Sequence, residues 1–113
     1  MDCVFCQIIA GKIPSQTLYQ DEEVIAFRDI NPLAPIHVLI IPKRHIPSLA
    51  QLTDDEAPLI GHMTKVANQL AREDGILGSG YRLVISSGEE GGQVVPHLHM
   101  HLLGGRRLSV KLC

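Results

Sequence analysis

The chain has 113 residues, 45% of them hydrophobic, with a formal net charge of −2 and a pI near 6.3. This length predicts one domain over residues 1–113 with a core that needs no disulfide bridges. The sequence has no basic cluster beyond the pairs Lys43-Arg44 and Arg106-Arg107, which argues against a nucleic-acid surface but allows a small anionic ligand. The lack of a long apolar run and of a signal-like start predicts a cytosolic protein without a membrane segment.

The N-terminal half predicts a short helix and three strands. Asp2 is expected to cap the helix, which ends before Gly11, and its apolar face consists of Val4, Phe5, Ile8 and Ile9. Segments 17–20 and 24–28 are predicted strands joined by the acidic turn 21–23, as in a hairpin. After a proline-containing loop, residues 37–41 form a predicted buried strand that Pro42 closes.

The C-terminal half predicts one long helix and two further strands. Thr53 and Glu56 form a capping box, Pro58 moves the helix start a residue or two onward, and helical periodicity continues to Gly75. His62 lies beside the apolar stripe and is interpreted as structural or solvated. With strands at 81–85 and 96–103, the sequence predicts an α+β domain on an antiparallel sheet of about five strands.

Residues 96–103 read Pro-His-Leu-His-Met-His-Leu-Leu and are the most informative stretch. In an extended strand the three histidines share one face, about 6 to 7 Å apart, and the apolar residues share the other. One interpretation is a half-buried strand with a polar face or a surface metal-binding tract. The strict alternation favours a functional strand whose imidazoles surround a phosphate-sized group.

The alternating histidines, preceded by Gly91, Gly92 and Gln93, resemble the signature of the histidine triad (HIT) nucleotide-binding family. The resemblance extends from about Val4 to Arg106 and is to the Hint branch. It implies a HIT-like fold with one long and one short helix, a purine nucleotide substrate and a homodimer. It also implies hydrolysis of nucleoside 5′-phosphoramidates through a covalent nucleotidyl-histidine.

Two other functions remain open at this stage. The same histidine chemistry serves dinucleoside polyphosphate hydrolases and nucleotidyl transferases, and product analysis separates these from a phosphoramidase. A module that binds a nucleotide or a partner protein with little turnover is the alternative from a different class. Turnover by the intact protein distinguishes that module from an enzyme.

The middle histidine of the triad is the expected nucleophile. A neutral imidazole attacks phosphorus well, and His99 has a histidine on each side to orient it or to contact the phosphate. The resemblance implies that His99 becomes nucleotidylated, that His101 contacts the phosphate and that His37 supports the nucleophile, with His97 completing the catalytic set. From sequence alone, His37 can also be a strand-start residue hydrogen-bonded to backbone.

The resemblance also assigns a nucleotide-binding set. It places the base against apolar residues and the ribose hydroxyls on Asp29, with the remaining residues around the phosphate. Without it, the apolar members read as core and Asp29 as a solvated turn carboxylate. The full set is Val4, Phe5, Ile8, Phe27, Asp29, Ile30, Leu39, Ser86, Gly92, Val94, Val95, His99 and His101.

Three features depart from the Hint pattern. Ser86 stands where that branch usually has asparagine, and Val94 where it often has serine. Both positions normally help to hold the phosphate. If nothing replaces the usual side chain, each departure is expected to remove about 1 to 3 kcal/mol of the stabilisation that the site gives the phosphate. The given sequence also ends before the longer C-terminal tail usual in that branch, so selectivity that such a tail supplies is not expected from these residues.

Cys3 and Cys6 form a Cys-x-x-Cys pair that can be a redox motif, two unrelated thiols or half of a zinc site. Tetrahedral zinc needs four N or S ligands, and His45 and His97 are the candidates to complete it. Some histidine triad relatives, including galactose-1-phosphate uridylyltransferases, resemble this pattern. The prediction is a structural zinc, with no cofactor required for catalysis and Cys113 incidental.

Overall fold

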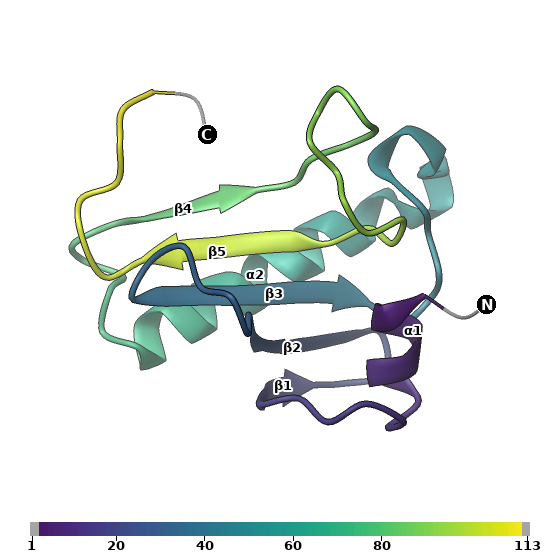
Figure 1. Ribbon diagram of the computed structural model, residues 1–113, viewed down its shortest axis with the longest axis horizontal. Coiled ribbons are helices and arrows are strands. Elements are labelled where there is room, and N and C mark those ends of the chain that lie inside the picture. The colour runs from purple at the N-terminus through teal and green to yellow at the C-terminus, as the bar shows by residue number, and fades with distance from the viewer. Residues whose placement is uncertain (1–2, 112–113) are drawn as a thin grey trace.

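The computed structural model describes residues 3–111 and contains one antiparallel sheet between a long and a short helix (Figure 1). The strands lie in the order β1-β2-β3-β5-β4. This arrangement confirms the predicted α+β class and the sheet of about five strands. The elements are α1 (Val4–Ile9), β1 (Thr17–Gln20), β2 (Val24–Arg28), β3 (Ile36–Pro42), η1 (Leu49–Gln51), η2 (Asp54–Glu56), α2 (Ala57–Glu73), β4 (Tyr81–Val84) and β5 (Met100–Gly104).

The two faces of the sheet carry different apolar sets, because side chains alternate along each strand. The face toward α2 presents even-numbered residues of the central strands, such as Val38, Ile40 and Leu102, which pack on the apolar stripe of α2. The opposite face presents Leu39 and other odd-numbered residues, which pack against α1. A slip of one residue in register would move each set to the opposite face, away from the helix on which it packs. The register therefore directs His37 and His101 to the α1 face.

The histidine strand is shorter than the sequence predicts. The prediction placed residues 96–103 in one strand, but β5 begins at Met100, so His97 and His99 precede it. The reason is a long-range bond, because the Leu98 N–H donates to the Ile46 carbonyl at 2.7 Å. The His97 N–H also closes a tight turn onto the Val95 carbonyl at 2.8 Å. His97 consequently leaves the common histidine face.

The helix starts follow the sequence in part. The predicted cap Asp2 lies outside the described residues, and α1 is capped by Cys3, whose Sγ accepts the Cys6 N–H at 3.1 Å. The capping box of Thr53 and Glu56 is present, but it begins the 3₁₀ turn η2, and α2 starts only at Ala57. β1 and β2 have the predicted bounds, whereas β4 ends one residue early, at Val84.

His62 has the structural role that one interpretation gave it. Its Nε2 lies 2.7 Å from Asp21 Oδ2, so it ties α2 to the turn between β1 and β2. This contact lies on the α2 side of the molecule, and His62 does not line the cavity described below. Across residues 3–111, no helix has the length and hydropathy that a membrane span requires.

Candidate functional site

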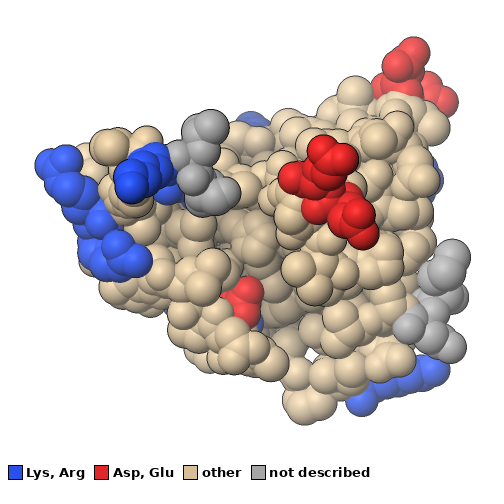
Figure 2. All heavy atoms as spheres, turned by 45° about the horizontal axis from the view of Figure 1, so that its top comes forward, with Lys and Arg blue, Asp and Glu red and all other residues tan. Residues whose placement is uncertain are grey.

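A cavity of about 660 Å³ opens on the sheet face that carries α1. We call it the histidine cavity. Figure 2 shows the molecule hollowed near the middle of the view, with mostly uncharged surface around the hollow. The structure brings together all thirteen residues of the predicted nucleotide-binding set. The histidine cavity is lined by every member of that set: Val4, Phe5, Ile8, Phe27, Asp29, Ile30, Leu39, Ser86, Gly92, Val94, Val95, His99 and His101.

His99 is buried at the floor of this cavity with a defined tautomer. Its Nδ1 lies 2.7 Å from the His97 carbonyl, and since a carbonyl can only accept, Nδ1 carries the proton. The unprotonated Nε2 is therefore the atom with a free lone pair. Phe5 packs edge-on against the ring, with centroids 5.1 Å apart, and holds its orientation. This arrangement provides a neutral nitrogen nucleophile without a separate base.

His37 and His101 form a second defined pair. The Leu33 N–H donates to Nδ1 of His37 at 3.0 Å, so the proton of the neutral His37 ring sits on Nε2. That Nε2–H donates to Nδ1 of His101 at 2.9 Å. The proton of His101 must then be on its own Nε2. The pair meets because His101 lies opposite Leu39, so His37 is its diagonal neighbour across β3 and β5.

Burial keeps this pair neutral. Burial lowers the pKa of His101 to about 4, with further lowering from His99 and His37 and partial opposition from Asp29. Burial likewise lowers the pKa of His37, and the Asp29 carboxylate partly opposes the shift. Both rings are therefore uncharged near neutral pH. His101 can donate one hydrogen bond from Nε2 to an oxygen of a bound phosphate.

Asp29 lies at the mouth of the cavity, directly after β2. Its Oδ1 accepts the Asn31 N–H at 2.8 Å, which fixes the carboxylate. Its Oδ2 lies 3.4 Å from His37 Nε2, whose proton already goes to His101. Oδ2 consequently keeps acceptor capacity for a hydroxyl group of a ligand.

The loop between β4 and β5 contains a residue whose role the sequence did not reveal. Gln93 Nε2 donates to the carbonyls of Pro47, at 2.6 Å, and Val95, and its Oε1 accepts the Gly88 N–H at 2.8 Å. Gly91 is required beside it, because a Cβ there would stand 2.6 Å from the Ser87 carbonyl oxygen. In the sequence, only its position directly after Gly91 and Gly92 drew attention to Gln93. Its partner Pro47 is distant in the chain, so no local pattern indicates the contact.

The four predicted metal ligands converge beside the histidine cavity, in what we call the Cys₂His₂ cluster. The sulfur-to-nitrogen distances from Cys3 and Cys6 to Nδ1 of His45 and His97 are 3.2–3.7 Å, and the two Nδ1 atoms lie 3.2 Å apart. The edges of a tetrahedron with Zn–S near 2.3 Å and Zn–N near 2.0 Å are about this long. His97 Nε2 donates to the Pro42 carbonyl at 2.8 Å, which leaves Nδ1 unprotonated, as a metal requires.

A second group of potential metal-binding atoms, from Asp29, His37 and His101, does not fit a metal. Coordination by His37 Nε2 needs that nitrogen to be unprotonated. Its Nδ1 already accepts the Leu33 N–H, so a metal would force the ring into the imidazolate form. The hydrogen-bond pattern therefore keeps this group for proton donation and leaves the Cys₂His₂ cluster as the candidate metal centre.

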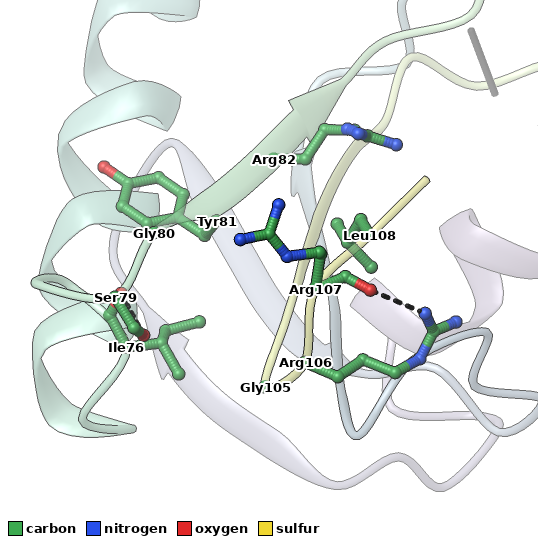
Figure 3. Close-up of a pocket in the computed structure, with 9 residues that line it drawn as sticks. All are labelled: Ile76, Ser79, Gly80, Tyr81, Arg82, Gly105, Arg106, Arg107 and Leu108. Atoms are coloured by element: carbon green, nitrogen blue, oxygen red, sulfur yellow. Dashed lines mark hydrogen bonds between the residues drawn. The ribbon is translucent and has the colours of Figure 1, made fainter. Parts of the chain in front are cut away.

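A different cavity, of about 560 Å³, lies where β4 begins and β5 ends. Figure 3 shows it lined by Tyr81 and the arginines Arg82, Arg106 and Arg107. Its described lining contains no histidine, cysteine or carboxylate. It therefore offers positive charge and hydroxyl groups, but its described lining has no group that ordinarily titrates near neutral pH. The histidine cavity is therefore the stronger candidate for the functional site.

The fold and site define a class: an α+β protein in which a buried histidine, just before the last strand, lies at the floor of an apolar cavity of nucleotide size. Residues 2–110 match the family described as "Scavenger mRNA decapping enzyme C-term binding". The chain is also 46% identical over 111 residues to the purine nucleoside phosphoramidase of Escherichia coli strain K12, covering 98% of this chain and 93% of that protein.

Solved structures agree with this result. A histidine triad protein from Clostridium difficile superimposes with a TM-score of 0.96 at 44% identity, covering 99% of this chain and 97% of that one. A zinc-bound histidine triad family protein from Mycobacterium smegmatis gives a TM-score of 0.82 at 32% identity, with coverages of 98% and 82%. The chain belongs to the histidine triad family, and its predicted likeness to the Hint branch is confirmed.

Proposed function

We propose that this protein hydrolyses the P–N bond of purine nucleoside 5′-phosphoramidates and releases the nucleoside monophosphate. The observation that carries the proposal is the tautomer of His99, which leaves Nε2 unprotonated in a cavity of nucleotide size. The E. coli relative named purine nucleoside phosphoramidase, 46% identical, supports the choice of substrate. The proposed nucleophile is His99.

The reaction proceeds in two displacements with one water consumed. The lone pair of His99 Nε2 attacks phosphorus, an Nε2–P bond forms, and the P–N bond to the amine breaks, with the departing amine taking its proton from solvent. The ring becomes cationic while Nδ1–H donates to the His97 carbonyl, which stabilises that charge. Hydroxide, left when solvent gives up that proton, then attacks phosphorus and restores neutral His99.

The other residues of the histidine cavity bind the substrate. We assign the purine to the apolar wall of Phe5, Phe27 and Leu39, all at most 6% exposed, and the ribose hydroxyls to Asp29. His101 Nε2–H donates to a phosphate oxygen, and His37 fixes the tautomer that makes this possible. Removing such a donor from a transition-state oxyanion typically lowers the rate by about 10²-fold or more.

We also propose that the Cys₂His₂ cluster binds one structural zinc ion. Its four protein ligands fill the tetrahedron, so zinc would act by tying α1 to the segment before β5 and not as a reactant. The zinc-bound relative from M. smegmatis supports this assignment. Thiolate ligands require a reducing environment, so we place the protein in the cytoplasm.

A homodimer is the proposed assembly. β4 is an edge strand that pairs with β5 on one side, and its residues are half-buried, which leaves a row of backbone groups for another strand. Pairing of β4 with its copy would extend the sheet across two protomers. Light scattering that gives the mass of one chain at micromolar concentration would exclude this assembly.

Incubation with adenosine 5′-phosphoramidate tests the activity, with release of AMP as the expected result. Diadenosine polyphosphates, offered in parallel, are expected to react more slowly. A nucleotide-binding module with little turnover is the alternative favoured by Val94, an apolar side chain 89% exposed in the histidine cavity. Tight AMP binding without product from any of these substrates would support that module.

A further inference from the structure

The C-terminal segment contacts the loop that borders the histidine cavity. Arg106 Nη2 donates to the Leu33 carbonyl at 3.2 Å. The N–H of the same residue, Leu33, donates to His37 Nδ1 at 3.0 Å, and His37 Nε2 donates to His101 at 2.9 Å. An unbroken series of contacts therefore joins an exposed arginine to the triad.

We propose that Arg106 is a positioning residue: it holds Leu33 so that the Leu33 N–H keeps His37, and through it His101, in the reactive tautomer. The inference rests on the proposed function in assigning His101 a role at the phosphate. If the Leu33 N–H moved away, His37 Nδ1 could take the proton and Nε2 could no longer donate to His101. His101 could then carry its proton on Nδ1 and would lose the donor that faces the substrate.

Leu33 needs such a contact because its surroundings hold it weakly. Its side chain is 71% exposed, so packing contributes little to its position. Pro32 and Pro35 on either side have no N–H with which to fix the loop. Its carbonyl bond to Arg106 and its N–H bond to His37 are the hydrogen bonds formed by Leu33 among residues 3–111.

Gly105 provides a second, independent indication that this contact is built into the fold. It has φ +90°, a left-handed conformation that favours glycine, and a Cβ would stand 2.9 Å from Pro35 Cβ and 3.3 Å from Ile36 N. A side chain at this position would push the C-terminal segment away from the loop. Glycine permits the close approach that brings Arg106 to Leu33.

Arg107 is a matched control for Arg106. Both are exposed, adjacent and equally charged, and both line the cavity in Figure 3. Their side chains point to opposite sides in that view. No hydrogen bond from the Arg107 guanidinium is found among residues 3–111, whereas Arg106 contacts Leu33. A general effect of surface charge should thus be equal in Arg106→Ala and Arg107→Ala.

The experiment combines ring spectroscopy with kinetics on the full chain. Long-range ¹H–¹⁵N spectra of histidine-labelled protein at neutral pH report which nitrogen of His37 and His101 carries the proton. We expect wild type and Arg107→Ala to show Nε2–H on both rings, and Arg106→Ala to show a tautomer mixture. kcat/KM for adenosine 5′-phosphoramidate should fall about five-fold in Arg106→Ala alone. Arg106→Lys, which keeps a donor, should recover part of this loss.

Two results would overturn the inference. One is an identical ring spectrum in Arg106→Ala and Arg107→Ala, and the other is a changed spectrum with unchanged kcat/KM. A melting temperature close to wild type confirms that Arg106→Ala is folded, and Gly105→Ala should reproduce the tautomer change by another route. Absence of turnover in wild type would reject the proposed function, while the ring spectra would still decide whether Arg106 fixes His37.

Discussion

His97 and His99 are separated by one residue, but backbone carbonyls hold their rings in opposite tautomers. His97 donates from Nε2 to the Pro42 carbonyl, which leaves Nδ1 facing two sulfur atoms. His99 donates from Nδ1 to the His97 carbonyl, which leaves Nε2 facing the histidine cavity. The same side chain thus presents Nδ1 to the Cys₂His₂ cluster in one place and Nε2 to the histidine cavity in the other, according to which nitrogen the backbone occupies.

Phe5 shows that the two sites share structural support. Its ring packs edge-on against His97 at 5.9 Å and against His99 at 5.1 Å, and it also contacts Phe27. Phe5 belongs to α1, whose cap residue Cys3 and first turn supply the two thiols of the Cys₂His₂ cluster. Loss of the metal should therefore loosen a wall of the cavity, whereas loss of the nucleophile should leave the metal in place. Substitutions made in one site, with activity and zinc content both measured, can show whether the two sites act separately.

The largest expected effect comes from His99→Ala. Without the nucleophile, kcat/KM for adenosine 5′-phosphoramidate should fall by at least about 10³-fold, because no other group in the cavity has an unprotonated nitrogen facing it. AMP binding should remain measurable by calorimetry, since the apolar wall and Asp29 are unchanged.

His62→Ala is the control, because His62 contacts Asp21 away from the cavity and should leave turnover within a few-fold of wild type. Zinc content and melting temperature of His99→Ala should match wild type. Near-normal activity in His99→Ala would remove the covalent mechanism, and loss of zinc from it would show that the two sites are not separable.

The next largest effect is expected from the Cys₂His₂ cluster. Purified without a histidine tag, the protein should contain about one zinc per chain, and Cys3→Ser or His45→Ala should lose it. Because metal binding is coupled to folding, the melting temperature should fall by about 10 °C, equivalent to about 2 kcal/mol. kcat/KM should fall less than in His99→Ala, because the nucleophile remains.

Cys113, which lies outside the described residues, offers a matched thiol control: Cys113→Ser should retain the metal, since Cys3, Cys6, His45 and His97 already provide four ligands. Metal-free wild-type protein that keeps its stability and activity after chelation would exclude a structural zinc. Equal loss of zinc in Cys113→Ser would instead reassign the ligands.

An effect of similar size on stability, but none on activity at neutral pH, is expected from pH through His101. Its pKa of about 4 in the folded protein is below the ordinary 6.5, so the unfolded chain binds the proton first as the pH falls. The free energy of unfolding should be constant above about pH 6.5 and should decrease between that value and about pH 4. At about pH 5 the decrease attributable to His101 is about 2 kcal/mol.

Urea unfolding at about pH 7.5 and pH 5 measures this decrease, and His101→Gln should show a smaller one because it lacks the titrating ring. Burial also lowers the pKa values of His37 and His97, so some dependence should remain in the variant. An unchanged pH dependence in His101→Gln would mean that His101 does not titrate below its ordinary range.

Sequence patterns correctly predicted the structural features that depend on residues close together in the chain. The acidic turn between two strand-like segments placed β1 and β2 correctly, and the family resemblance assembled the residues that line the cavity. The histidine strand was predicted too long because the Leu98 N–H bonds to Ile46, a distant partner that periodicity does not reveal. The tautomers of His97 and His99, and the contact of Arg106 with Leu33, depend in the same way on backbone atoms brought close by folding.

The smallest effect, and the only expected gain, concerns the phosphate end of the histidine cavity. Val94 lines that cavity but is 89% exposed, and Ser86 is half-buried beside it, so neither packs in the core. A hydroxyl at 94 or an amide at 86 could donate to a phosphate oxygen as its charge develops.

Val94→Ser and Ser86→Asn should therefore each raise kcat/KM toward phosphoramidates about five- to ten-fold, with little change in melting temperature. Val110→Ser is the matched control, because Val110 is 93% exposed and does not line the cavity. A rise in all three would indicate a general surface effect. If Val94→Ser and Ser86→Asn both leave the kinetics unmoved, neither residue touches the phosphate, and the donors there are His101 and the glycine-rich backbone alone.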